Sequence, residues 1–351
     1  MRIALQASPW NRADLFEAAG FDVVEKPVRT EDELIDLLAE ADGAEVGVVP
    51  LTSRRVLEAC PNLKVVSRMG VGVDSIDLDA ATELGILACN VPGVNTAEVA
   101  DHAMAMLLSI TRRIHDAVPA MREGTWSSDR PGTVQRFHQR TRRIAGHTVG
   151  IIGFGDIGRG FAARVRGFGP SRVVAYDPYV PATTAEIFGV EMLSLEELLT
   201  QSDFVSIHCS ATAETRHLIN ADTLSLMKPT AILVNTARGP IVDGAALADA
   251  LEAGAIEAAA LDVTEVEPID PDDRLLKLAN CIVTPHIAGF SPTFLEQCPI
   301  RQAENVIRVL TGEAPHGLAN PEVIKTIAVM RASGNAGRWQ GVPDFSTALR
   351  L

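Results

Sequence analysis

Three ionisable residues of this sequence each stand beside a turn: Arg238 before a Gly-Pro pair, Glu267 directly before Pro268, and His286 directly after Pro285. A guanidinium presents a planar fork to a carboxylate and can polarise a ketone oxygen, while an imidazole gives or takes a proton. A carboxylate beside that imidazole raises its pKa and keeps it charged near neutrality. The trio predicts acid–base chemistry on a substrate that carries a carboxylate, with Arg238, Glu267 and His286 as the catalytic residues.

A glycine-rich turn precedes all three residues. Gly153, Gly155 and Gly158 follow the apolar segment 148–152 and open a helix-like stretch. The first glycine permits a tight turn, the second lets the backbone approach a pyrophosphate, and the third lets helix and strand pack closely. Asp177 ends the next apolar segment, where a carboxylate accepts hydrogen bonds from both ribose hydroxyls of NAD and repels the 2′-phosphate of NADP. The pattern predicts NAD as the cofactor and, with the three ionisable residues, hydride transfer.

Other candidates stand at the ends of other predicted strands. His208 either contacts the cofactor or is an ordinary wall residue. Asp262 either accepts a hydrogen bond from the nicotinamide amide or orients the acid–base pair. In the segment MGVGVD at 69–74 the glycines free consecutive backbone N–H groups, which favours an anion-binding turn over a plain one. Val71 and Gly72 are therefore candidate contacts for the substrate carboxylate, opposite Arg238.

Short apolar segments alternate with helix-like stretches along the chain, which predicts an α/β fold with parallel sheets covered by helices. In the first part, strands are expected at 2–7, 23–26, 45–49, 63–67 and 86–91. From residue 148 the rhythm restarts, with six strands expected at 148–152, 172–176, 204–208, 231–235, 258–262 and 281–284. Six is the strand number of a doubly wound dinucleotide-binding domain.

The segments outside these strands predict a long apolar helix at 97–121 and an amphipathic helix at 291–310, which could return the chain to the first domain. The basic stretch 126–143 is aperiodic, so it is expected to be a surface loop or, alternatively, a lid or dimer contact near an acidic ligand. Residues after 321 contain few apolar clusters and are expected to be held loosely.

Composition bounds the possible partners. The 351 residues are 47% hydrophobic, which suffices for two cores, and the formal net charge of −14 makes nucleic acid and anionic membranes poor direct partners. The apolar runs are too short to span a bilayer, and the N-terminus reads as a strand rather than a secretory signal. Five cysteines without a CxxC pair fit reduced thiols and a cytoplasmic protein, and no metal site is expected.

Taken together, the motifs resemble those of the D-isomer-specific 2-hydroxyacid dehydrogenase family over residues 40–320. The resemblance is carried by SRMGVGVD at 67–74, NVPG at 90–93, the glycine turn from Gly153, NTARG at 235–239, LDV at 261–263 followed by Glu267-Pro268, and TPHI at 284–287. It implies a catalytic triad of Arg238, Glu267 and His286, which singles out Glu267 over its neighbour Glu265. It also implies a 2-keto or 2-hydroxy acid substrate and NAD bound in the cleft between two Rossmann- or flavodoxin-like domains.

The resemblance also implies a domain organisation and a set of contacts. Residues 1–96 and 292–330 are expected to form a discontinuous substrate-binding domain, 97–291 the NAD-binding domain and 331–351 a loosely held tail, with a homodimer built on the helix near residue 100. Substrate contacts are expected from Val71, Gly72 and Arg238. Cofactor contacts are expected from Gly153, Gly155, Asp156, Ile157, Gly158, Asp177, His208, Cys209, Thr215, Thr236, Ala237, Asp262 and Gly289.

Within the family, YDPY at 176–179, HC at 208–209 and HLIN at 217–220 are most similar to the C-terminal-binding-protein branch, although Gly289 stands where that branch has a tryptophan. Those proteins are NAD-dependent corepressors that retain a dehydrogenase site. The sequence therefore favours an NAD-dependent D-2-hydroxyacid dehydrogenase. A binding protein gated by NAD(H) and a phosphoglycerate dehydrogenase-like enzyme remain as alternatives.

Overall fold

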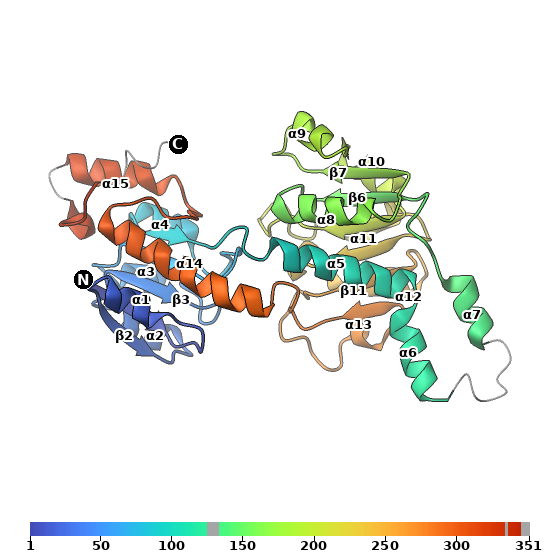
Figure 1. The fold of residues 1–351 in the computed structure, drawn as a ribbon, viewed down its shortest axis with the longest axis horizontal. Coiled ribbons are helices and arrows are strands. Elements are labelled where there is room, and N and C mark those ends of the chain that lie inside the picture. The colour runs from blue at the N-terminus through green and yellow to red at the C-terminus, as the bar shows by residue number, and fades with distance from the viewer. Residues whose placement is uncertain (125–132, 334–335, 345–351) are drawn as a thin grey trace. The chain divides into compact units, whose positions relative to one another are not determined.

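The computed structural model describes residues 1–124, 133–333 and 336–344, and the chain divides into two compact units (Figure 1). Unit 1 is formed by both ends of the chain, Met1–Asn95 and Ser291–Leu351, and unit 2 by Thr96–Phe290. Each unit is an α/β layer structure with its own buried apolar core. The assignment of unit 1 to substrate binding stays a prediction.

Unit 1 contains a sheet in which the described residues form five parallel strands in the order β2-β1-β3-β4-β5. The strands are β1 (Arg2–Gln6), β2 (Asp22–Lys26), β3 (Gly43–Val46), β4 (Val65–Arg68) and β5 (Leu87–Cys89). The expected strand at 45–49 is shifted, because the Gly47 N–H donates to the side chain of Gln6 instead of continuing the sheet, at 2.8 Å. Residues 47–52 consequently form a loop at the carboxyl edge.

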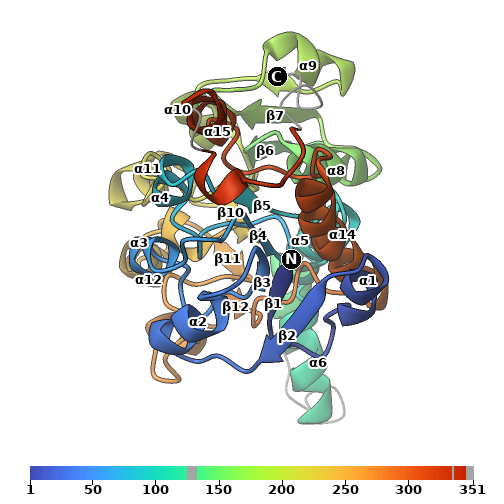
Figure 2. The same cartoon turned by 90° about the vertical axis from the view of Figure 1, so that its left-hand side faces the viewer.

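Helices cover both faces of this sheet, as Figure 2 shows. One face packs against α1 (Ala13–Ala18) and the long α14 (Pro292–Thr311), and the other against α2 (Glu31–Leu38), α3 (Arg54–Glu58) and α4 (Leu78–Glu83). Gly43 is needed on the α14 face, because a Cβ there would lie 2.7 Å from Val306. The chain end adds α15 (Val323–Ala332), which contacts α4.

The segment after α15 is packed more firmly than the sequence suggests. The turn η2 (Gly337–Trp339) buries Trp339 completely, and its indole Nε1 donates to the Gly85 carbonyl at 2.8 Å. A buried aromatic ring with a satisfied N–H anchors residues 336–344 to unit 1, so the expectation of a loosely held tail is wrong for them. Residues 334–335 and 345–351 lie outside the described residues.

Unit 2 contains a parallel sheet in the order β12-β11-β10-β9-β6-β7-β8, seven strands within the described part of the chain. Its strands are β6 (Thr148–Ile152), β7 (Arg172–Tyr176), β8 (Glu191–Met192), β9 (Phe204–Ile207), β10 (Ile232–Asn235), β11 (Ala258–Leu261) and β12 (Cys281–Val283). The six expected strands are present, and β8 is an additional two-residue edge strand that is too short to produce a sequence pattern.

The helices of unit 2 lie on both faces of its sheet. On one face α5 (Thr96–Thr111) packs beside α8 (Asp156–Arg166), and on the other lie α10 (Leu195–Gln201), α11 (Ala221–Leu226) and α12 (Gly244–Glu252). The remaining helices are α6 (Ile114–Arg122), α7 (Thr133–Arg140), α9 (Ala182–Ile187), the short turn η1 (Gly239–Ile241) and α13 (Arg274–Lys277).

Two expectations about unit 2 are wrong. Residues 97–121 form two helices, because the buried Arg113 has φ 57°, a left-handed conformation that cannot continue a right-handed helix. The guanidinium of Arg113 instead bonds Asp116 in the first turn of α6. The basic stretch 126–143 is not a loop throughout, because it includes helix α7, and its residues 126–132 lie outside the described structure; a lid or dimer contact stays a prediction.

The described residues were also considered for a membrane span and a metal site by their length, apolar character and grouping of ligand side chains. No helix among them is long and apolar enough to cross a membrane. In the same residues no group of three or more His, Cys, Asp or Glu side chains is arranged to hold a metal ion.

Candidate active site

The three candidate catalytic residues follow three neighbouring strands of unit 2. Arg238 follows β10, Glu267 lies on the loop after β11, and His286 follows β12. The strands pair in register, Asn235 with Leu261 and Leu261 with Val283. Because carboxyl ends of parallel strands meet at one edge, the three loops meet there.

His286 and Glu267 form a hydrogen-bonded pair. Nδ1 of His286 lies 2.7 Å from Oε2 of Glu267, and the Thr264 N–H donates to Oε1 of the same carboxylate at 3.1 Å. Burial alone would raise the pKa of Glu267, but the hydrogen bond and charge of His286, with the nearby Arg238, hold it below its ordinary value. An ionised carboxylate only accepts hydrogen bonds, so Nδ1 carries the proton and Nε2 is the nitrogen that can exchange a proton with a ligand.

The turn that carries His286 is held by Asp262, a carboxylate that is almost fully buried. Its Oδ1 accepts from the Thr284 hydroxyl at 2.6 Å and the Ile287 N–H at 3.0 Å, and its Oδ2 accepts from the Ala288 N–H at 2.8 Å. The turn needs such support because His286 has φ 52°, a conformation that is costly for a residue with a Cβ. Of the two roles expected for Asp262, these contacts favour orienting the acid–base pair.

His102 on α5 completes this support and was not among the sequence candidates. Its Nε2 lies 3.4 Å from Oδ1 of Asp262 and 3.2 Å from the Thr284 hydroxyl. Burial would raise the pKa of Asp262, but hydrogen bonds from His102, Thr284 and the backbone lower it. The sequence signal for His102 is a histidine on a mostly apolar helix, and the sequence does not identify the residue that this histidine contacts.

Arg238 is positioned by the Asn235 side chain and by a close approach of two loops. Asn235 donates to the Arg238 carbonyl at 2.9 Å and accepts from the Ala237 N–H at 3.0 Å. A Cβ on Gly239 would lie 1.8 Å from the Thr264 carbonyl oxygen, so only glycine lets the Arg238 segment pack on the loop that carries Glu267. The guanidinium donates to the Ala237 carbonyl at 2.7 Å.

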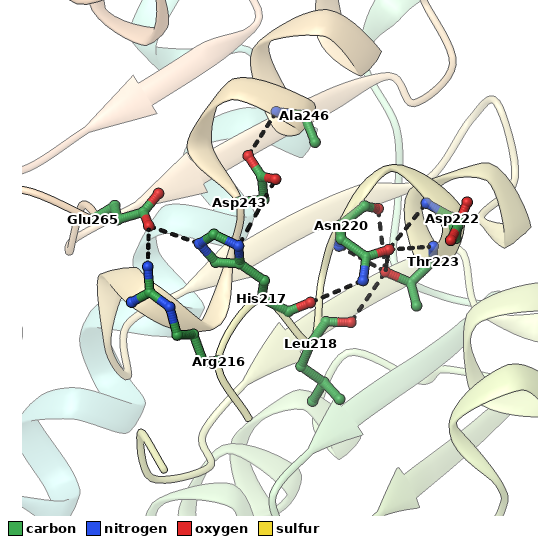
Figure 3. Close-up of polar contacts among 9 residues, drawn as sticks. All are labelled: Arg216, His217, Leu218, Asn220, Asp222, Thr223, Asp243, Ala246 and Glu265. Carbon is green, nitrogen blue, oxygen red and sulfur yellow. Dashed lines mark hydrogen bonds and ion pairs between the residues drawn. The ribbon is translucent and has the colours of Figure 1, made fainter. Parts of the chain in front are cut away.

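The neighbouring Glu265 turns to a different histidine, as Figure 3 shows. Its Oε1 lies 2.7 Å from Nε2 of His217 and 3.2 Å from Nη2 of Arg216. Nδ1 of His217 lies 3.9 Å from Oδ2 of Asp243, whose other oxygen caps α12 through the Ala246 N–H. The loop after β11 therefore contributes one glutamate to each of two histidine pairs, and Glu267 is the one beside Arg238 and His286.

In the glycine-rich turn, neighbouring atoms occupy the space that a side chain would need at Gly153 and Gly158, but that space is open at Gly155. A Cβ on Gly153 would lie 2.4 Å from the Cys209 nitrogen, and one on Gly158 would lie 2.2 Å from the Gly153 carbonyl oxygen. No atom lies within 4 Å of the corresponding position on Gly155. Gly155 is followed by the exposed Asp156 at the start of α8, so a phosphate could approach both the open backbone and the helix N-terminus.

Asp177 closes the other side of this turn. Its Oδ2 accepts from the Phe154 N–H at 2.8 Å and its Oδ1 from the Tyr179 N–H at 2.9 Å. Each carboxylate oxygen has a second lone pair, so the partly exposed side chain can still accept from ribose hydroxyls. The geometry fits a dinucleotide whose ribose is unphosphorylated.

Comparison with known proteins decides what this arrangement belongs to. Residues 104–288 match the family described as "D-isomer specific 2-hydroxyacid dehydrogenase, NAD binding domain". The chain belongs to the D-isomer-specific 2-hydroxyacid dehydrogenase family. Its unit 2, which contains the matched residues, is an NAD-binding domain.

The chain is similar to family members that are named for different enzyme activities. A glyoxylate reductase of Korarchaeum cryptofilum is 42% identical over 303 residues, 86% of this chain and 87% of that protein. A D-3-phosphoglycerate dehydrogenase of Mycobacterium tuberculosis is 40% identical over 340 residues, 95% of this chain but 62% of that protein. The solved structure of apo D-mandelate dehydrogenase of Rhodotorula graminis has TM-score 0.78 at 29% identity, and covers 91% of this chain and 97% of its own. The chain thus spans less than two thirds of the mycobacterial relative.

Two of the residues that are expected to contact NAD have polar atoms that could form hydrogen bonds with a ligand. The Thr236 hydroxyl and Nδ1 of His208 are buried without a hydrogen-bond partner in the described structure. Burial lowers the pKa of His208 to about 3, so its imidazole is neutral, with Nε2 2.9 Å from the Ser206 hydroxyl. Two orphaned buried atoms near the strand ends fit a bound polar ligand.

The remaining expected cofactor residues have other contacts. The Thr215 hydroxyl donates to the Ser210 carbonyl at 2.7 Å and thereby shapes its own loop. Burial raises the pKa of the Cys209 thiol to about 11, so this residue contributes backbone rather than a thiolate. Ile157 is half-buried in α8, and Ala237 and Gly289 lie on the turns that carry Arg238 and His286. Their contacts with NAD stay predictions.

In unit 1, the carbonyls of Val71 and Gly72 are turned inward. Asn90 donates to the Val71 carbonyl at 2.8 Å, and the Arg68 guanidinium donates to the Gly72 carbonyl. In a trans peptide the N–H points opposite to the preceding carbonyl, so the N–H groups of Gly72 and Val73 point away from Asn90 and Arg68. This geometry fits an anion-binding turn, and its ligand stays a prediction.

Proposed function

We propose that this protein is an NAD-dependent D-2-hydroxyacid dehydrogenase that interconverts a 2-keto acid and a D-2-hydroxy acid. The observation that carries the proposal is the His286–Glu267 pair, 2.7 Å apart, on loops that also present Arg238 at the carboxyl edge of an NAD-binding domain. In the reducing direction the keto carbon gains a hydride and the keto oxygen gains a proton. NADH supplies the hydride when bound, and NAD⁺ takes it back in the reverse reaction.

The protein residues supply the proton and the binding. Arg238 binds the substrate carboxylate and polarises the keto oxygen. His286 donates from Nε2 to that oxygen, while Glu267 holds Nδ1–H and stabilises the charged imidazole. Asp262 and His102 keep the imidazole in place. From unit 1, the N–H groups of Gly72 and Val73 are proposed to hold the carboxylate, so that Val71 and Gly72 line the substrate site.

The proposed cofactor preference is NAD over NADP, because Asp177 would repel a 2′-phosphate. The proposed contacts of the pyrophosphate are the Gly153–Gly158 turn with Asp156 and Ile157, and Thr236 and His208 offer unpartnered atoms nearby. NADH and NADPH titrations followed by nicotinamide fluorescence test this preference. Asp177→Ala should weaken NADH binding and narrow the difference between the two cofactors.

A panel of keto acids tests the activity itself. Oxidation of NADH should accompany addition of at least one of glyoxylate, pyruvate, hydroxypyruvate and longer 2-keto acids, and the product should be the D isomer. Tight NADH binding without turnover of any of them would instead favour the alternative, a binding protein gated by NAD(H) and similar to corepressors.

A second enzyme class has a specific observation in its favour, the 40% identity to D-3-phosphoglycerate dehydrogenase. The basic residues from Arg130 to Arg143 also leave this class open, because a phosphorylated acid is anionic. Within that stretch, Arg142 is engaged with Glu257 at 2.8 Å and with the Thr230 carbonyl, and Arg130 lies outside the described residues. Arg142 is therefore already engaged within the protein, and 3-phosphohydroxypyruvate belongs in the keto-acid panel.

A homodimer is proposed as the assembly. Helix α6 exposes Ile114, Val118 and Met121 on one stripe, and an apolar stripe on a surface helix is typical of a subunit interface. Sedimentation of the protein and of Val118→Asp tests it, because the charge should shift the protein toward the monomer. A cytoplasmic location also stays a prediction.

A further inference from the structure

Unit 1 contains a carboxylic acid inside its core. Glu45 on β3 is 2% exposed, and its Oε1 has no hydrogen-bond partner among the described residues. The Ser67 hydroxyl on the neighbouring strand β4 is likewise buried without a partner in that part of the chain. Glu45 and Ser67 are paired in register, so both side chains lie on the same face of the sheet. A buried carboxyl in this setting is costly to ionise.

Helix α14 covers the face on which Glu45 lies. Gly43 precedes Glu45 by two positions, and side chains of a strand alternate between faces, so both positions face the same way. A Cβ on Gly43 would meet Val306 of α14. One helical turn before Val306, Gln302 donates from Nε2 to the Ser67 carbonyl at 3.0 Å. Glu45 is therefore enclosed between the sheet and α14.

The same helix supports the turn at 69–74. Cys298, one turn before Gln302, is fully buried, and the backbone of Gly70 hydrogen-bonds its sulfur. Burial raises the pKa of the Cys298 thiol to about 11, although the contact with Gly70 opposes this, so the thiol is uncharged at neutral pH. Helix α14 thus connects the enclosed carboxyl to the proposed anion-binding turn.

The surroundings of Glu45 do not stabilise a negative charge. Glu25 on β2 is itself negative, and burial together with this charge raises the pKa of Glu45 to about 8. Arg68 on β4 donates to the Gly72 carbonyl. Leu5 on β1 is the neighbour of Glu45 in the sheet.

The charged side chains of the two helices on this face are not enclosed with Glu45. They are all partly or fully exposed: Asp14 and Glu17 on α1, and Glu296, Arg301, Glu304 and Arg308 on α14. A carboxylate at Glu45 would therefore gain hydration only if α14 moved away from the sheet.

We propose that Glu45 is a proton-operated switch of unit 1. With its proton, the neutral carboxyl stays packed between the sheet and α14. Without its proton, the carboxylate is hydrated by separation of α14 from β3 and β4, and the turn at 69–74 loses its contact with Cys298. The switch acts within unit 1 and does not depend on the proposed dehydrogenase reaction.

The sign of the pH dependence follows from the raised pKa. The packed state holds the proton more tightly than an open state, in which a hydrated carboxyl has its ordinary pKa. Opening therefore becomes easier as the pH rises from the ordinary carboxyl value to about 8, and changes little above it. The equilibrium constant for opening should rise roughly ten-fold between pH 6 and 7, and about two-fold or less between pH 8 and 9.

Cysteine alkylation followed by peptide mass spectrometry measures this opening. Cys298 lies under α14, whereas the equally buried Cys60 belongs to the core on the opposite face of the same sheet. The alkylation rate of the unmodified protein is divided by that of Glu45→Gln at the same pH, which removes the titration of the thiol itself. For Cys298 this ratio should rise with pH as stated above, and for Cys60 it should stay constant within about two-fold.

Two further variants complete the experiment. Glu17→Gln replaces an exposed glutamate of α1 in the same unit and should behave like the unmodified protein. Glu45→Leu provides a second reference without an ionisable group if Glu45→Gln folds poorly. A Cys298 ratio that is constant with pH would overturn the switch. Equal rises at Cys298 and Cys60 would also overturn it, because the carboxyl would then act on the whole unit rather than on α14.

Discussion

Two histidine–glutamate pairs share the loop after β11, and they differ in what the second ring nitrogen meets. His286 and Glu267 are 2.7 Å apart, as are His217 and Glu265, and both histidines have positive φ, 52° and 49°. The other nitrogen of His217 faces Asp243 at 3.9 Å, and Arg216 shares Glu265. In the described structure, Nε2 of His286 has no protein hydrogen-bond partner.

A short histidine–carboxylate distance by itself does not identify a catalytic base. Both ring nitrogens of His217 face a carboxylate. The backbone N–H of His217 donates to the Pro240 carbonyl at 2.9 Å, so His217 ties the Arg238 segment to the loop that carries both glutamates. The His286 pair leaves one nitrogen for a ligand. One pair therefore holds loops together, and the other can move a proton.

The largest expected effect is at His286. His286→Asn tolerates the left-handed backbone but cannot act as a general acid at neutral pH, so kcat should fall roughly 10²–10⁴-fold. NADH binding, measured by fluorescence titration, should persist because the glycine turn is untouched. Turnover within two-fold of the unmodified protein would remove His286 from the mechanism.

Asp262 should have the next largest effect, on stability and turnover together. Asp262→Ala leaves the Thr284 hydroxyl and the Ile287 and Ala288 N–H groups without their acceptor, which should cost about 3 kcal/mol in the free energy of unfolding. Because the folded pKa of Asp262 is lowered, its stabilisation is present above the ordinary carboxyl pKa and is lost as pH falls through the lowered value. Urea unfolding at several pH values measures both.

Replacing each of the two glutamates in turn tests whether the two histidine–glutamate pairs differ in function. Glu267→Gln should lower kcat about ten-fold, because the charged imidazole loses its counter-charge, whereas Glu265→Gln should leave kcat within about two-fold. The lowered pKa of Glu267 keeps its carboxylate charged until the pH falls below the ordinary range, so the acid-side loss of kcat should begin there and disappear in Glu267→Gln. Equal effects of both substitutions would mean that the pairs are not functionally distinct.

The smallest effect is expected at His217. His217→Asn keeps the positive φ but loses the contact with Glu265, so the melting temperature should fall by about 2–4 °C. The kcat should change only a few-fold and the shape of its pH profile should not change, since a loop contact is lost rather than a proton donor. A changed acid side of the kcat profile, measured in the same buffers as the Glu267 series, would show that His217 takes part in the reaction and does more than hold the loops together.

The sequence was a good guide where chemistry depends on short motifs. The glycine turn, the strand ends and the candidates Arg238 and His286 follow from residue type and spacing, because a strand–turn–helix leaves few alternatives, and the family resemblance singles out Glu267. It was a poor guide at Arg113 and Trp339. The helix break rests on one left-handed residue that no local pattern marks, and the tail is anchored by one indole whose partner, the Gly85 carbonyl, is distant in the sequence.

For this protein, the sequence motifs identified the family, the order of the strands along the chain and the candidate acid–base residues. The tertiary structure decided which glutamate meets which histidine, since Glu265 and Glu267 differ by two positions and their partners lie on separate loops. It also decided the roles of Asp262 and His102, because burial and hydrogen-bond partners arise only when α5 is packed against the sheet. The spacing of residues in the sequence indicates the type of chemistry, whereas the packing of the fold determines which residues orient the candidate catalytic side chains.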